Sequence, residues 1–155
     1  MNNMNYNRER HIELLKRKEN FTSQKKSFLK ENPQERLELA KYNGAVEQHI
    51  FWEDRFEVAS LIQAFLNKKM DGEEFHDSVF GLRRKHKAKC DKFLSKLVSE
   101  EIKDFFPNKE SHKLKGFLTS LYCVCEHFEE NFEDKEFETS IRNGLLKFQK
   151  ILNEE

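Results

Sequence analysis

The sequence predicts an all-helical protein, and three observations lead to that prediction. Apolar residues recur every three or four positions over several long stretches, which places them on one face of a helix. Glycine and proline are scarce, with 5 and 2 residues among 155, and this disfavours a turn-rich β fold. Fifteen phenylalanines supply bulky core material, although only 37% of the residues are hydrophobic. We expect an antiparallel four-helix bundle with one or two extra N-terminal helices.

The first third of the chain is expected to form polar helices outside the bundle. One helical stretch runs from Arg8 to Glu31 and stops at Asn32-Pro33, because the residue before proline avoids the α region. Pro33 suits the first turn of a second helix, which should reach about His49 with an interruption at Asn43-Gly44. Lys and Glu dilute the apolar positions in both stretches. Residues 1–50 are therefore predicted to be a polar helical extension.

Four stronger helical patterns follow, and they define a predicted bundle over residues 51–155. Asp71 and Glu74 have the spacing of a capping box at the start of the second helix, which continues to Leu97. Ser111 is expected to cap the third helix, and a short acidic link ending at Asp134 precedes the fourth. In the first helix the apolar residues fit one face, and they are Phe56, Ala59, Leu61, Ile62, Phe65 and Leu66.

Cysteine usage and hydropathy indicate a reducing compartment. The sequence has an odd number of cysteines and no secretory signal, so we expect free thiols at Cys90, Cys123 and Cys125. No apolar run approaches the roughly 20 residues of a membrane-spanning helix. We therefore expect a cytoplasmic protein, or one in an equivalent compartment such as an organelle stroma or matrix, with no membrane contact.

Catalytic and metal-binding motifs are missing from the sequence. There is no Gly-rich phosphate loop, and no H-E-x-x-H or C-x-x-C motif. His86 and Cys90 are four residues apart and could share a helix face as metal ligands do, but a core or surface thiol beside a solvated histidine is the far commoner case. Cys123 and Cys125 are two residues apart and point to different sides of a helix. We expect no enzyme, no cofactor and no metal.

The charge is balanced overall, at 28 basic and 28 acidic residues, but it is uneven along the chain. A basic stretch occupies the second helix of the predicted bundle, and it comprises Arg83, Arg84, Lys85, Lys87, Lys89, Lys92 and Lys96. An acidic stretch spans the end of the third helix and the following link, and it comprises Glu126, Glu129, Glu130, Glu133, Asp134, Glu136 and Glu138. Asymmetry of this kind bears on partner binding and not on fold.

Each charged stretch could be an ordinary solvated helix face or a surface that binds a partner, which for the basic stretch would be a nucleic acid. The basic residues run nearly all round their helix, so they form no single stripe facing a nucleic-acid backbone. Carboxylates near a helix C-terminus are opposed by the helix dipole, by about 0.3–1 kcal/mol each, so the acidic cluster works mildly against stability. It is either a solvated acidic corner or a phosphate-like surface that fits a basic cleft on a partner.

Four segments of the sequence resemble colicin D-type immunity proteins, in the same order and at nearly the same spacings. The stretch from Leu61 to Phe75, LIQAFLNKKMDGEEF, is similar to the opening helix and turn of that family. Arg83-Arg84 follows at the distance of the family's basic pair. The stretch from Leu121 to Glu129, LYCVCEHFE, is similar to its third helix, where acids flank an aromatic residue. The stretch from Ile141 to Ile151 resembles its closing helix, so the similarity covers about residues 59–152.

The resemblance implies a fold and a function. The fold would be a four-helix antiparallel bundle, and the partner would be the basic catalytic domain of a tRNA-cleaving toxin, whose active site the protein would cover. Carried over by position, the contacts would be Glu126 and Glu129, which flank Phe128, with Glu130 and Asp134 nearby. Glu130 and Asn131 stand where the family has a Pro and an Asp just beyond the aromatic, so the contact set differs there.

Two alternatives stay open beside the immunity hypothesis. The protein could associate with RNA or the ribosome through its basic helix and its N-terminal third, and tRNA binding that steepens at low salt would distinguish this case. It could also be an orphan helical scaffold that keeps an immunity-like fold without a toxin partner, because a shared fold does not establish a shared function. The sequence names neither a particular toxin nor an oligomeric state.

Overall fold

A computed structural model describes residues 6–24, 32–102, 108–126 and 134–152, although at 134, 148 and 150–152 it describes the backbone only. These ranges hold six helices and no strand, which confirms the all-helical prediction. The helices are α1 (Arg8–Ser23), α3 (Pro33–Glu53), α4 (Arg55–Leu66), α5 (Gly72–Val98), α6 (Ser111–Glu126) and α7 (Asp134–Leu152). Part of the stretch predicted to run from Arg8 to Glu31 is thus α1, and residues 25–31 lie outside the description.

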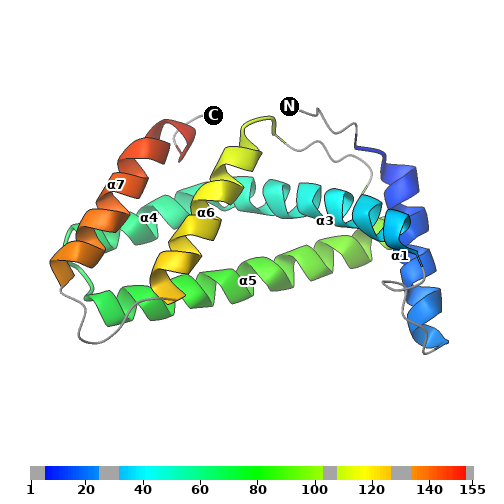
Figure 1. Cartoon of the computed structure of the whole chain (residues 1–155), viewed down its shortest axis with the longest axis horizontal. Helices are drawn as coiled ribbons and strands as arrows, with labels where there is room; N and C mark the ends of the chain where they lie inside the picture. Colours follow the sequence, from blue (N-terminus) through cyan, green and yellow to red (C-terminus); the bar gives the residue numbers. More distant parts are fainter. Residues whose placement is uncertain (1–5, 25–31, 103–107, 127–133, 153–155) are drawn as a thin grey trace.

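The helices form two layers with α1 across one end (Figure 1). α3 and α4 follow one another nearly in line, and α5 returns antiparallel to them. α6 and α7 form an antiparallel pair that leans across this layer, so that α6 packs against α3 and α7 packs against α4. The α4–α5 turn lies at one end of the molecule. The C-terminal end of α6 and the N-terminal end of α7 lie at this same end (Figure 1).

The predicted helix starts are confirmed in two cases and corrected in one. Pro33 is the first residue of α3. At α5, the Asp71 carboxylate accepts from the Glu74 backbone N–H at 2.8 Å, and the Glu74 side chain accepts from the Asp71 N–H at 3.0 Å. Ser111 does not cap α6. It is the first helical residue, fully buried, and its hydroxyl donates to the Asn108 carbonyl at 2.6 Å, because Asn108 begins the turn before the helix.

The expected interruption of α3 at Asn43-Gly44 is wrong, because α3 is continuous from Pro33 to Glu53. The two residues instead fit contacts with neighbouring helices. The Asn43 side chain accepts a hydrogen bond from His11 Nε2 of α1 at 2.8 Å. Gly44 faces α6, where an added Cβ would lie 3.4 Å from the Lys115 Nζ, an ordinary contact with the end of a flexible side chain. Tertiary packing thus overrides the weak helix propensity of Asn and Gly.

The main core joins the end of α3 to α4, α5, α6 and α7. Its buried side chains are Trp52, Val58, Ile62, Phe65, Leu66, Phe75, Val79, Leu82, Leu114, Phe117, Leu118, Leu121, Cys125, Phe137 and Ile141. Three of its rings fasten α4, α5 and α7 together. Phe65 stacks on Phe75 with ring centroids 4.5 Å apart, and Phe137 lies edge-on to both at 5.6 and 6.0 Å.

One residue of the predicted apolar face of α4 is misplaced. Phe56 is 52% exposed, whereas Val58 is fully buried. The buried stripe of α4 follows Arg55, Val58, Ile62 and Phe65, and Phe56 lies one residue, or about 100°, away from it. The Phe56 ring instead covers the Arg55 guanidinium, whose carbon lies 4.4 Å from the ring centroid.

The N-terminal third packs on the rest of the chain through α3. Ala45, Val46 and Ile50 form a second buried cluster with Cys90 of α5, so the predicted division at residue 50 falls within α3. α1 is joined to α3 by His11, which is fully buried and lies 2.9 Å from the Tyr6 hydroxyl. Whether residues 1–50 form a unit of their own stays a prediction. Over the described ranges, no helix combines the length and apolar character needed to cross a bilayer.

Replacement of Phe75 by alanine is expected to destabilise the protein strongly. The side chain is fully buried and contacts two other rings, so its loss leaves a cavity and should cost about 3–5 kcal/mol of unfolding free energy. Urea unfolding followed by circular dichroism measures this change. Phe56→Ala, at a half-exposed ring, is the matched control and should cost about 1 kcal/mol or less. Equal losses in the two variants would contradict the assignment of the core.

Candidate functional site

The two ends of the predicted acidic surface are the last turn of α6 and the first turn of α7, which lie at the end of the molecule where the α4–α5 turn also lies (Figure 1). Glu126 is the last residue of α6, and Asp134 is the first residue of α7. Phe128, Glu129 and Glu130 lie outside the described residues, as does the side chain of Asp134. The structure therefore places the two ends of this segment, and the roles expected of its middle residues stay predictions.

Glu126 is exposed and paired across helices with Arg83 of α5. The Arg83 Nη1 lies 2.9 Å from the Glu126 Oε1, and the two side chains are 50% and 47% exposed. The same guanidinium lies over the Tyr122 ring, 5.2 Å from its centroid. An ion pair this exposed contributes only about 0–1 kcal/mol, so a cation from a partner can compete for the Glu126 carboxylate.

The first turns of α7 carry the rest of the acidic cluster that the structure describes. Glu136 is exposed, and Glu138 pairs within the helix with Arg142 at 2.9 Å. These carboxylates are near a helix N-terminus, where the dipole favours them, whereas Glu126 at the end of α6 is opposed by its own helix. The acidic surface is thus assembled from two helix ends of opposite electrostatic preference.

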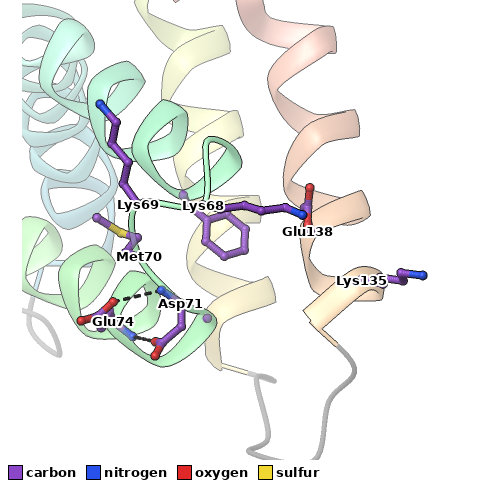
Figure 2. Close-up of a pocket in the computed structure, with 9 residues that line it drawn as sticks. Lys68, Lys69, Met70, Asp71, Glu74, Lys135 and Glu138 are labelled. Carbon is purple, nitrogen blue, oxygen red and sulfur yellow. Dashed lines mark hydrogen bonds between the residues drawn. The ribbon is translucent and has the colours of Figure 1, made fainter.

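A shallow hollow of about 500 Å³ lies beside this surface, between the α4–α5 turn and the start of α7. Lysines 68, 69 and 135 line it together with the acids of the α5 capping box and Glu138, as Figure 2 shows. The Lys68 side chain extends toward Glu138, whereas Lys69 and Lys135 point away from each other and from the hollow (Figure 2). The three ammonium groups do not converge, so this hollow is no anion-binding cage.

The basic stretch of α5 is partly paired with acids of neighbouring helices. Lys85 contacts Glu57 of α4 at 2.7 Å, and Lys89 contacts the Asp54 carboxylate at 2.7 and 2.6 Å. With Arg83, three of the seven predicted basic residues are engaged in this way. The other four form no ion pair within the described ranges, and they are Arg84, Lys87, Lys92 and Lys96. These pairs reduce the positive charge that α5 can offer to a nucleic acid.

A buried polar network that the sequence reading missed lies where α3, α4, α5 and α6 meet. His86 of α5 is only 2% exposed, with its Nε2 3.2 Å from Asp54 Oδ2 and its Nδ1 3.5 Å from the Tyr122 hydroxyl. Burial lowers the pKa of His86, although the Asp54 carboxylate opposes this shift. Burial also raises the pKa of Tyr122 to about 12, so the phenol stays neutral. His86 continues the apolar spacing of Val79 and Leu82, and this could have signalled a buried histidine.

The thiols show no sign of activation. Burial raises the pKa of Cys90 to about 11 and that of Cys125 to about 12, so both stay protonated at neutral pH. Cys123 is exposed on the other side of α6 from the buried Cys125, as their spacing predicted. Within the part of the chain that the structure describes, no three His, Cys, Asp or Glu side chains are grouped so as to hold a metal ion.

Comparison with known proteins found no match for this chain. No family model matches it, and neither a curated protein nor a solved structure matches it significantly. The likeness to colicin D-type immunity proteins therefore depends on the sequence motifs alone.

A double-mutant cycle on Arg83 and Glu126 should give a small coupling energy. Because both side chains are about half exposed, Arg83→Ala, Glu126→Ala and the double variant should yield about 1 kcal/mol or less from urea unfolding. The matched cycle on Lys89 and Asp54, whose carboxylate is only 13% exposed, should give a larger value. A coupling energy at Arg83–Glu126 that exceeds the one at Lys89–Asp54 would contradict the view that a partner's cation can readily displace Arg83 from the Glu126 carboxylate.

Proposed function

We propose that this protein is an immunity-type inhibitor, which binds the basic catalytic domain of a tRNA-cleaving toxin through the acidic segment between α6 and α7. The observation that carries the proposal is the density of charge in that segment. Seven carboxylates and a single lysine occupy the 13 residues from Glu126 to Glu138. Glu126, at the end of α6, is opposed by the helix dipole, so its position there favours a role in binding over one in stability.

The proposal assigns the four-helix bundle of the immunity family to α4, α5, α6 and α7. In its support, these four helices contribute nearly all of the main core, with the end of α3 adding Trp52. The segments that resemble the family fall on α4 with its following turn, on α5, on the end of α6 and on α7. In this proposal α1 and α3 are additions to the family's fold.

The acidic segment would act by occupying the place of the substrate's phosphates. A tRNA-cleaving site must attract a polyanion, so its cleft is basic, and carboxylates of fitting spacing compete for the same Lys and Arg side chains. Long-range attraction would speed the encounter and make it sensitive to salt. Glu126 suits this role because its ion pair with Arg83 is exposed and weak. A cation of the toxin could displace Arg83 and bind the Glu126 carboxylate.

Neutralising two acids of the segment should weaken inhibition. We expect Glu126→Gln with Glu129→Gln to lower the affinity for the toxin catalytic domain about tenfold or more, because each lost charge pair at a desolvated contact removes roughly 1–3 kcal/mol. The probe is a basic tRNA-cleaving toxin domain, and the measurement is tRNA cleavage at increasing inhibitor concentration.

The matched control is Glu19→Gln with Glu101→Gln, which changes the net charge equally at exposed sites of α1 and of the segment after α5. α1 and the C-terminal end of α5 lie at the far end of the molecule from the start of α7 (Figure 1). This control should inhibit as the wild type does. Equal loss in both double variants would contradict a specific acidic contact, and failure of the wild type to inhibit would reject the proposed function, leaving the orphan-scaffold alternative.

RNA binding is a second candidate function, and one observation favours it. The four exposed cations of α5 that have no ion-pair partner in the described ranges could contact a phosphate backbone. The other three are neutralised by acids, so we expect no shift of tRNA in a gel at low salt and micromolar protein. A shift that disappears in Lys87→Gln with Lys92→Gln would favour RNA binding over toxin inhibition.

A further inference from the structure

α3 and α4 are separated by one residue, Asp54, and the side chain of this residue holds both helices to α5. The Asp54 N–H donates to the Ile50 carbonyl, and the Asp54 carbonyl accepts from the N–H groups of Glu57 and Val58, so these bonds span the turn between the two helices. The Asp54 carboxylate does not cap α4. Both of its oxygens lie within hydrogen-bonding distance of Lys89 Nζ, at 2.7 and 2.6 Å. The angle between the two helices therefore depends on a contact with α5.

His86 completes this junction without a satisfied hydrogen bond at Nε2. The atom lies 3.2 Å from Asp54 Oδ2 but is not aligned for a hydrogen bond. The imidazole is enclosed by the Phe51 ring of α3, 4.9 Å away, and by Tyr122 of α6. A neutral ring fits this enclosure, because it leaves only one polar atom unsatisfied.

Charged groups surround His86 on three sides, and they are nearly balanced. Asp54 at the break and Glu57 of α4 favour an imidazolium, while Lys85 and Lys89 of α5 oppose it. From α6 only the neutral Tyr122 faces the ring, and α3 presents Phe51. Lys89 already compensates the charge of Asp54, so protonation of His86 would add a net positive charge to an enclosed site and favour entry of water into the junction.

We propose that the α3–α4 junction is a proton-responsive joint, in which protonation of His86 opens the contact of Asp54 with α5 and α6 while the helices stay folded. At 2% exposure the His86 ring has almost no water to stabilise an imidazolium, whereas the open arrangement would hydrate it. Acid therefore favours the open arrangement. The direction of the pH dependence follows from the linkage between protonation of His86 and closure of the junction. A histidine whose pKa is lowered in the closed state takes up its proton more readily once opened, so closure weakens as the pH falls below about 6.5. This inference goes beyond the proposed function and does not depend on it.

The protein contains its own reporter of the joint. Trp52 is the single tryptophan, it is 7% exposed, and its backbone carbonyl accepts a hydrogen bond from the Arg55 guanidinium across Asp54 at 2.9 Å. The same guanidinium stacks on the Trp52 ring, 4.4 Å from its centroid. Opening of the junction would hydrate this ring and shift its emission to longer wavelength.

The test is a pH titration from 8 to 4.5 of the full chain, followed by Trp52 emission and far-ultraviolet circular dichroism. We expect a reversible red shift that begins below about pH 6.5, while the helical signal stays constant. His86→Gln should abolish the shift. No red shift above the pH at which the helical signal is lost would overturn the proposal.

Two further measurements separate His86 from other titrating groups. His49 is three residues before Trp52 on α3, and burial lowers its pKa as well, so His49→Gln is the matched control and should keep the shift. A shift that persists in His86→Gln, or vanishes in His49→Gln, would reject the joint. If His86→Gln does not fold, the NMR titration of the His86 ring in the wild type decides. Its midpoint must coincide with that of Trp52 emission, and a separate midpoint overturns the proposal.

Discussion

Three phenylalanine rings determine where the acidic segment lies. Phe65, Phe75 and Phe137 come from α4, α5 and α7, and their mutual contacts hold the α4–α5 turn against the start of α7. Because the rings are rigid and buried, the helix ends around them are fixed in position although they carry many charges. The core contacts that fix these helix ends therefore do not involve the acidic residues.

Burial divides the electrostatic contacts of the molecule into two kinds. Arg83–Glu126 and Lys85–Glu57 are about half exposed, so solvent screens them and they fasten the helices only weakly. The contact of Asp54 with Lys89 and His86 is mostly enclosed, so a change in charge there is felt by the fold.

The positions of the helices could be predicted from the sequence, but the way in which they pack could not. Helical periodicity, the Pro33 start and the Asp71–Glu74 capping box are local signals, and the structure reproduces them. Asn43-Gly44 was misread as a break because its reason lies in the distant Lys115 and His11. Phe56 was misplaced because a face defined by apolar residues alone ignores Arg55, which takes a buried position. The acidic segment could be found from charge density, but the pairing of Glu126 with Arg83 joins residues 43 positions apart.

The packing of α3 against α6 has a consequence for synthesis of the protein. α3 spans Pro33–Glu53, whereas α6, on which it packs, begins only at Ser111. A ribosome adding roughly 5–20 residues per second completes α6 several seconds after α3. During that interval part of the apolar surface of α3 lacks its native cover. The polar character of α1 and of the first half of α3 then keeps the nascent chain hydrated, which gives a reason for so many lysines and glutamates ahead of the core.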